Sequence, residues 1–137
     1  MLSNTVLRRV EWGDCDPAGI VFNPQYFRWF DHGTEMLYEA GGWPKPAMLA
    51  EFGGAGCPIV ETRAAFRMPC RYGDDVRITS EITRVGRSSF EVAHTLTRDG
   101  EVCVEGSETR VWTVRGADGA LHSAPLPEPL AERFRDE

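Results

Sequence analysis

The chain has 137 residues, of which 42% are hydrophobic and 26% are charged, and its formal net charge is −6 at pH 7. This length and composition predict a single compact domain over residues 1–137. The acidic balance excludes a general nucleic-acid binder, because neutralising backbone phosphates requires a basic surface.

The first predicted elements are a strand and a loop. Residues 5–12 mix apolar and charged positions in a way that favours a strand. Residues 13–19 contain two glycines and Pro17, which lacks a backbone donor and biases the residue before it away from the helical region. A loop is therefore expected between the first strand and the next element.

A long helix is predicted to follow. Asn23 and Pro24 are typical of a helix start, with Asn23 as the N-cap and Pro24 at the first helical position. Apolar and aromatic residues then recur at helical spacing for about 17 residues, and Gly41–Gly42 ends the helix. Gly33 lies inside it at a cost of about 1 kcal/mol relative to alanine, which indicates close backbone packing at that position.

From Cys57 onward the apolar period changes to two, which predicts strands. Turn-like residues separate these strands, and no connection between them is long enough for a parallel crossover. We therefore expect an antiparallel meander with Gly106 as a bulge, then an extended tail and a short terminal helix. The predicted strands cover residues 60–68, 76–82, 90–96 and 102–114, and the terminal helix surrounds Leu130 and Phe134.

This order of elements predicts an α+β fold. A helix that is apolar over so much of its circumference has to be wrapped by other elements rather than laid on a surface. The expected architecture is the hotdog fold, a curved antiparallel sheet of about five strands wrapped around one long central helix.

Several features bear on where the protein acts. The N-terminal residues 1–4 lack the charged and apolar regions of a signal peptide, and no stretch approaches the roughly 20 apolar residues that cross a bilayer. The cysteines are scattered without a CxxC pair, which favours free thiols in a reducing compartment. We expect a cytoplasmic protein without membrane or nucleic-acid partners. The cysteines are Cys15, Cys57, Cys70 and Cys103.

Two aspartates, Asp14 and Asp16, lie in the loop just before the helix start. The N-terminus of a helix offers free N–H groups and the positive end of a dipole. A carboxylate that faces a carbonyl polarised by such a helix end is suited to acyl transfer. The simpler alternative is that Asp16 satisfies its own turn, as aspartate before proline often does. Asp14 is expected to be structural.

The stretch from Trp12 to Asp31 reads WGDCDPAGIVFNPQYFRWFD, and it closely resembles the signature of the 4-hydroxybenzoyl-CoA thioesterase family. The resemblance extends through residues 56–60 and the strand series, so it covers most of the chain. In that family the aspartate directly before Pro-Ala-Gly is the catalytic carboxylate, which implies this role for Asp16. The resemblance also implies that the backbone N–H of Asn23 polarises the thioester carbonyl.

The implied reaction is hydrolysis of an acyl-CoA to the free acid and CoA, without a metal or a cofactor. Asp16 either attacks the carbonyl to give a mixed anhydride or acts as a general base towards water, and the sequence leaves both routes open. The pattern around Pro17 and Pro24 resembles the aromatic-acyl branch of the family. We expect a small aromatic (benzoyl-type) or medium-sized acyl-CoA as substrate, with a short-chain acyl-CoA as the alternative.

Four further residues are candidates for substrate binding. Phe22 and Trp43 are suited to form an aromatic wall for a benzoyl group, and core packing is the competing explanation. Asp31 is placed to reach a substituent of the acyl group, although a solvated helix face explains it almost as well. Arg87 lies in the turn that carries a basic cluster for CoA phosphates in the resembled family, but Gly86 and Ser88 flank it here.

Two rival functions are kept open. A hydratase of the same fold would use a histidine with an acidic partner on the helix, and His32 with Glu35 is the pair available. A non-catalytic acyl-CoA binding module is the second rival. His94 lies on the apolar phase of its strand and is expected to be a core histidine. By resemblance, a homodimer or homotetramer with sites at the subunit boundary is expected.

Overall fold

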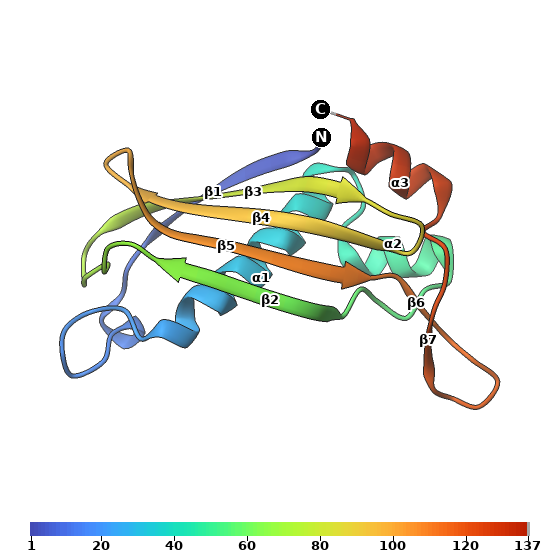
Figure 1. The fold of residues 1–137 in the computed structure, drawn as a ribbon, viewed down its shortest axis with the longest axis horizontal. Coiled ribbons are helices and arrows are strands. Elements are labelled where there is room, and N and C mark those ends of the chain that lie inside the picture. Colours follow the sequence, from blue (N-terminus) through green and yellow to red (C-terminus); the bar gives the residue numbers. More distant parts are fainter. Residues whose placement is uncertain (137) are drawn as a thin grey trace.

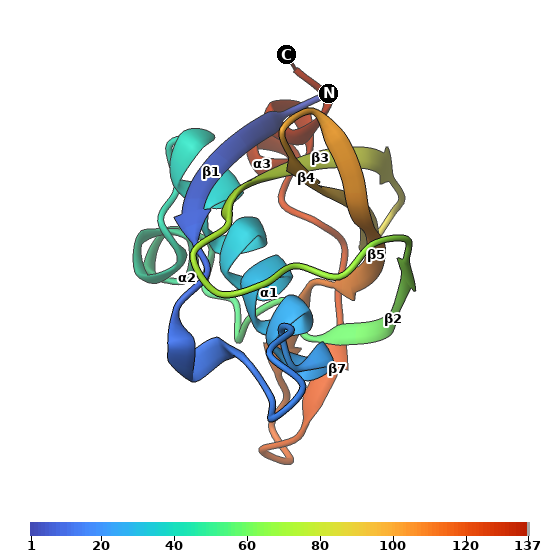
Figure 2. The same cartoon turned by 90° about the vertical axis from the view of Figure 1, so that its left-hand side faces the viewer.

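The structure is a computed structural model that describes residues 1–136; Glu137, the last residue of the predicted domain, lies outside the described residues. A five-stranded antiparallel sheet curves around the long helix α1 (Asn23–Ala40), as Figures 1 and 2 show from two directions. This arrangement confirms the predicted α+β hotdog fold.

The order of strands in the sheet differs from the predicted meander. Strands β3, β4 and β5 are consecutive neighbours, as expected, but β2 pairs with β5 at one edge and β1 pairs with β3 at the other. The segment between β2 and β3 passes the N-terminal end of α1, where the carbonyl of Cys70 accepts the N–H of Val21 at 2.9 Å. The strands are β1 (Ser3–Arg9), β2 (Ile59–Phe66), β3 (Asp75–Val85), β4 (Ser89–Arg98) and β5 (Glu101–Val111).

Helix α1 lies in the concave face of the sheet because its apolar residues recur at the spacing of one helical face. The close packing expected at Gly33 is present: a Cβ there would lie 2.5 Å from the Oγ of Ser80 on β3. The predicted start is off by one residue, since Phe22 is the N-cap and Asn23 is the first helical residue. The buried residues of α1 are Tyr26, Trp29, Phe30, Gly33, Thr34, Leu37 and Tyr38.

The core consists of two hydrophobic clusters with a polar layer between them. One cluster surrounds the N-terminal half of α1 and includes Phe30, and the other surrounds its C-terminal half and includes Leu37. Between them, α1 and three strands each contribute buried polar side chains at one level of the fold. These residues, called the polar layer below, are Thr34, Ser80, His94, Glu108 and Arg110.

The remaining elements were less completely predicted. Strand β1 ends at Arg9, and a short 3-10 helix, η1 (Trp12–Asp14), begins the loop. Helix α2 (Lys45–Phe52) was not predicted, whereas α3 (Glu128–Arg135) confirms the terminal helix. The predicted strand 102–114 is divided, because β5 ends at Val111 and a separate strand β6 (Thr113–Arg115) follows. β6 forms a hairpin with β7 (Leu121–Ser123), which lies in the expected extended tail.

The bulge predicted at Gly106 was wrong. Gly106 pairs in register with both Ala64 on β2 and His94 on β4. Packing explains why glycine occupies this position: a Cβ here would lie 2.6 Å from the ring of Phe30 on α1.

No helix within residues 1–136 combines the length and the apolar character that crossing a membrane would require. The four cysteines are free thiols; Cys57, Cys70 and Cys103 are buried, and Cys15 is partly exposed.

Candidate active site

The loop before α1 is a tight turn fastened to the rest of the fold. Cys15 and Val21 form an antiparallel bridge, and within it the N–H of Asp16 donates to the carbonyl of Ile20 at 2.9 Å. The N–H of Gly19 donates back to the carbonyl of Asp16 at 2.9 Å, and Gly19 has a φ of +80°, a conformation that favours glycine. The turn therefore holds the backbone of Asp16 in one position.

The side chain of Asp16 is partly exposed and partly engaged in this turn. Its Oδ1 accepts the N–H of Ala18 at 2.9 Å, which is the local bond that the simpler interpretation expects. Within residues 1–136 no hydrogen bond reaches its Oδ2. One carboxylate oxygen thus orients the side chain, and the other is available for chemistry.

Asp14 has the structural role expected of it. It is buried, and its Oδ2 accepts the N–H of Glu11 at 2.8 Å while Arg8 lies 3.6 Å from its Oδ1. Its carbonyl accepts the N–H of Phe22, the N-cap of α1, at 2.9 Å. Asp14 therefore ties the loop that carries Asp16 to the start of the helix.

The N-terminal end of α1 is open to a hollow. Asn23 is the first helical residue, so its N–H has no acceptor within the helix, and among residues 1–136 it donates no hydrogen bond. The N–H of Gln25 is used, because it donates to the carbonyl of Phe22 at 2.8 Å. A hollow of about 290 Å³ adjoins this end, lined by Ile20, Val21, Asn23, Tyr26, Phe66, Arg67, Met68 and Pro69.

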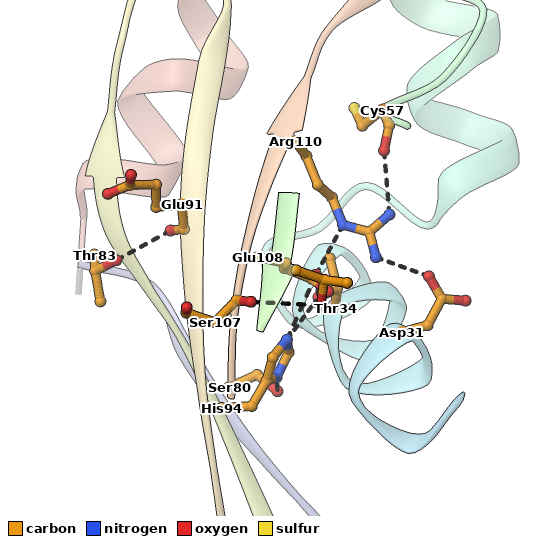
Figure 3. A network of polar contacts seen from close by, with 11 residues as sticks. Asp31, Thr34, Cys57, Ser80, Thr83, Glu91, His94, Ser107, Glu108 and Arg110 are labelled. Atoms are coloured by element: carbon orange, nitrogen blue, oxygen red, sulfur yellow. Dashed lines mark hydrogen bonds and ion pairs between the residues drawn. The ribbon is translucent and has the colours of Figure 1, made fainter. Parts of the chain in front are cut away.

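Asp31, two turns further along α1, is held by a buried arginine. Nη2 of Arg110 on β5 donates to Oδ1 of Asp31 at 2.7 Å, and Nη1 donates to the carbonyl of Cys57 at 3.1 Å. The side chain of Asp31 is 54% exposed, whereas that of Arg110 is only 6% exposed. Figure 3 shows the guanidinium between these two partners. Asp31 is therefore a fixed surface carboxylate rather than a freely solvated one.

Glu108 anchors Arg110 from inside the polar layer. Its Oε1 accepts Nε of Arg110 at 2.8 Å and also the hydroxyl of Thr34. Burial alone would raise the pKa of Glu108, but the hydrogen bonds from His94 and Arg110 outweigh burial and lower it to about 2. Burial alone would lower the pKa of Arg110, but Glu108 and Asp31 raise it above its ordinary value. The pair is therefore an ionised one.

His94 is the core histidine that was expected. Its Nε2 lies 3.4 Å from Oε1 of Glu108, and its Nδ1 is 2.8 Å from the hydroxyl of Ser80. The ring also stacks on Phe30 with centroids 4.8 Å apart. A chain of polar contacts thus runs from Ser80 in the core to Asp31 at the surface (Figure 3).

Comparison with known proteins shows the family of the chain. The model of the Thioesterase-like superfamily matches residues 10–134. The 4-hydroxybenzoyl-CoA thioesterase of Pseudomonas sp. (strain CBS-3) is 34% identical over 136 residues, covering 95% of this chain and 96% of that protein. The chain belongs to the 4-hydroxybenzoyl-CoA thioesterase family. The predicted class of activity, hydrolysis of an acyl-CoA thioester, is confirmed.

Solved structures agree with this assignment to the 4-hydroxybenzoyl-CoA thioesterase family. An aspartate-to-asparagine variant of 4-hydroxybenzoyl CoA thioesterase, complexed with 4-hydroxybenzoyl CoA, superposes with a TM-score of 0.90 at 30% identity over 98% of this chain and 99% of that one. A gentisyl-coenzyme A thioesterase superposes with a TM-score of 0.83 at 31% identity over 97% of this chain and 100% of that one.

In this family member, five of the six predicted site residues fall into two groups; the sixth, Asp31, lies two turns along α1. Asp16, Phe22 and Asn23 lie together at the N-terminal end of α1, and the side chain of Phe22 is 53% exposed. Trp43 and Arg87 lie at the opposite end of the molecule, as Figure 1 shows for the turn between β3 and β4. The 11 residues of β3 span about 33 Å, so one subunit does not bring these two groups together.

Trp43 is engaged in packing at the C-terminal end of α1. Its ring meets that of Phe52 edge-on with centroids 5.4 Å apart, and its indole N–H donates to Glu51. Arg87 is exposed, and its carbonyl accepts the N–H of Leu126 at 2.8 Å. The substrate-binding roles of Trp43 and Arg87 therefore stay predictions.

The pair predicted for the rival hydratase, His32 and Glu35, is not in contact. His32 is exposed beside Arg8 and Arg28, and Glu35 lies 3.8 Å from Lys45. Within the part of the chain that the structure describes, no three His, Cys, Asp or Glu side chains are grouped closely enough to hold a metal ion.

Sequence reasoning missed Glu108 and Arg110. Both lie on the inward phase of β5, where Val104 and Gly106 are also buried. Opposite charges two residues apart on the buried phase of a strand predict a buried ion pair, because neither charge is left inside without a partner. This pattern was not recognised because the apolar alternation in the predicted strand 102–114 is less regular than in the other strands.

Proposed function

We propose that this thioesterase hydrolyses a small aromatic acyl-CoA at the N-terminal end of α1, with Asp16 as the carboxylate that acts on the thioester. The observation that carries the proposal is the combination of an uncommitted Oδ2 on Asp16 and an uncommitted N–H on Asn23. The bond from Phe22 to Asp14 fixes the loop against the helix, so both groups are held before substrate arrives.

In the proposed reaction the thioester oxygen accepts the N–H of Asn23, and the positive end of the α1 dipole stabilises the developing negative charge. Asp16 either attacks the carbonyl carbon or removes a proton from an attacking water. The C–S bond then breaks, and CoA leaves as a thiolate that takes up a proton. In the first route water opens the mixed anhydride and restores the Asp16 carboxylate.

The proposed acyl group is aromatic and hydroxylated. The relatives named above act, by their names, on 4-hydroxybenzoyl-CoA and gentisyl-CoA. The hollow beside Asn23 has apolar walls from Phe66 and Met68, and we propose that Phe22 adds an aromatic edge. We assign Asp31 the role of accepting a hydrogen bond from a hydroxyl on the ring.

The spacing along α1 suits such a group. Asn23 and Asp31 are eight residues apart, which is about 12 Å along a helix. That length is comparable with a carbonyl, a benzene ring and one substituent laid end to end, with a hydrogen bond at each end.

We infer that the working unit is a homodimer or homotetramer of this single domain. Strand β2 is an edge strand whose backbone is unpaired on one side, and three of its large apolar side chains are exposed, Ile59, Val60 and Phe66. A second β2 would extend the sheet. Because Arg87 lies far from Asp16 in one subunit, we propose that it contacts the phosphates of CoA bound at a neighbouring subunit. The free thiols favour the cytoplasm.

Thiol release across a panel of aromatic and aliphatic acyl-CoAs tests the proposed function. We expect aromatic substrates to have the highest kcat/KM. Preference for acetyl- or propionyl-CoA would support the short-chain alternative, and tight binding without thiol release would support a binding module. Repeated turnover in labelled water separates the two routes: only the anhydride route transfers label to the Asp16 carboxylate.

A further inference from the structure

We propose that Arg110 is a positioning residue that sets the preference of this enzyme for hydroxylated aromatic acyl groups. Arg110 binds one oxygen of Asp31 and thereby presents the other oxygen to the ring hydroxyl. This inference rests on the proposed function, because it concerns the same site and the same class of substrate.

The geometry around Asp31 supports a directed acceptor. Oδ1 of Asp31 is bound to Nη2 of Arg110 at 2.7 Å, and within residues 1–136 no hydrogen bond reaches Oδ2. A carboxylate on an exposed helix face samples several rotamers, and each is solvated. The bond to Arg110 selects one of them, so the free oxygen has a defined direction before the substrate binds.

Arg110 is itself fixed by two hydrogen bonds besides the one to Asp31, which makes it able to orient Asp31. Its Nε donates to Glu108 at 2.8 Å and its Nη1 to the carbonyl of Cys57 at 3.1 Å. The guanidinium is planar, so these two bonds determine where Nη2 points. Cys57 precedes β2, and the same clamp therefore fixes the segment that leads into the exposed edge strand.

The charges of the polar layer strengthen the hydrogen bond that Asp31 is proposed to accept from the ring hydroxyl. Glu108 and Arg110 cancel each other inside the fold, so the carboxylate of Asp31 is the uncompensated charge of the group. That charge lies at the surface, where Asp31 is 54% exposed. A hydroxyl that donates to a charged acceptor forms a stronger hydrogen bond than one that donates to a neutral acceptor. An acyl group without a hydroxyl would leave Oδ2 of this carboxylate partly desolvated and without a hydrogen-bond donor.

The test compares 4-hydroxybenzoyl-CoA with benzoyl-CoA, which lacks the hydroxyl, and uses the ratio of their kcat/KM values as the readout. We expect the parent to favour the hydroxylated substrate and Arg110→Lys to reduce this ratio by about tenfold. Asp31→Asn should reduce the ratio similarly. The double variant with Asp31→Asn and Arg110→Lys should show no further reduction beyond that of Asp31→Asn alone. Arg77→Lys, an exposed arginine on the outer face of β3, should leave the ratio unchanged.

Destabilisation is separated from positioning by Leu130→Ala, which removes packing from α3 without touching Asp31. If its ratio falls as in Arg110→Lys, the ratio reports stability and the inference is overturned. An unchanged ratio in Asp31→Asn overturns it even where Arg110→Lys fails to fold. A parent that releases no thiol from either substrate contradicts the proposed function. A parent that hydrolyses both equally contradicts this inference and the hydroxyl-accepting role of Asp31, but leaves the proposed hydrolysis of aromatic acyl-CoA at Asp16 intact.

Discussion

Nη2 of Arg110 lies 2.7 Å from Oδ1 of Asp31, and this contact joins a buried residue of β5 to an exposed residue of α1. Helix α1 is thus attached to the sheet by a directed ion pair as well as by apolar packing. A side chain proposed to contact the substrate is therefore coupled to the stability of the fold, and the predictions below separate the two contributions.

Asp16→Asn should lower kcat for thiol release by at least about 10², because a neutral amide neither attacks a thioester nor takes a proton from water. Substrate binding should survive, since the side chain keeps its size. Thiol-release kinetics measure kcat, and titration with a non-hydrolysable CoA thioether measures substrate binding. Asp99→Asn is the matched control, because Asp99 is exposed and asparagine tolerates its φ of +52°. Parent-like hydrolysis by Asp16→Asn would rule out the mechanism.

Asn23→Pro tests the backbone N–H rather than a side chain. Proline suits the first helical position, and Phe22 before it already has an extended backbone with φ −66° and ψ 122°. We expect the fold to persist and kcat to fall by about 10² to 10³, as when one oxyanion donor is removed. Asn23→Ala keeps the N–H and should retain nearly full kcat. Equal activities in the two variants would mean that this N–H plays no part.

Glu108→Gln should lower the free energy of unfolding at pH 7 by about 3 kcal/mol, because Arg110 loses its buried counter-charge. The pKa of Glu108 is lowered from 4.5 to about 2, so its contribution is present above pH 4.5 and is lost as pH falls towards 2. Urea unfolding of parent and variant should therefore converge across that window. Glu105→Gln, which removes an exposed pair with Arg67, should cost less than about 1 kcal/mol at pH 7. A pH-independent gap between parent and Glu108→Gln would argue against an ionised Glu108.

Gly33→Ala should destabilise the protein although alanine is the better helix former by about 1 kcal/mol. The added Cβ would lie 2.5 Å from the Oγ of Ser80, and overpacking of this kind costs about 1 to 3 kcal/mol. Thermal unfolding measures the loss. Adding Ser80→Gly should recover part of it by removing the clashing atom. A stabilised Gly33→Ala would show that α1 and β3 are less closely packed than described.

Val60→Lys should shift the protein towards monomer, because a charge on an edge strand opposes pairing with a second edge. Leu7→Lys places the same charge on β1, the other edge, where the side chain is 67% exposed, and should leave the assembly intact. Light scattering coupled to gel filtration gives the mass of each. Dissociation by Leu7→Lys alone would place the subunit contact on β1.

Much of the fold followed from local sequence. The apolar positions of α1 recur at helical spacing, and those of β3 and β4 alternate, so their types and approximate bounds were predicted correctly. Helix α2 was missed because its short span carries no clear apolar face. The position of β2 beyond β5 was also missed, since pairing between strands distant in sequence depends on the whole sheet.

The sequence by itself determined the helix start to within one residue, the glycine-bounded turn around Asp16 and the family, because each depends on residues that are neighbours in the chain. Only the tertiary structure decided that Asp31 is held by Arg110, that Glu108 and His94 complete a buried polar layer, and that Arg87 lies at the far end from Asp16. Those relationships join α1 to strands more than fifty residues away. They depend on the register and curvature of the sheet, which no local pattern specifies.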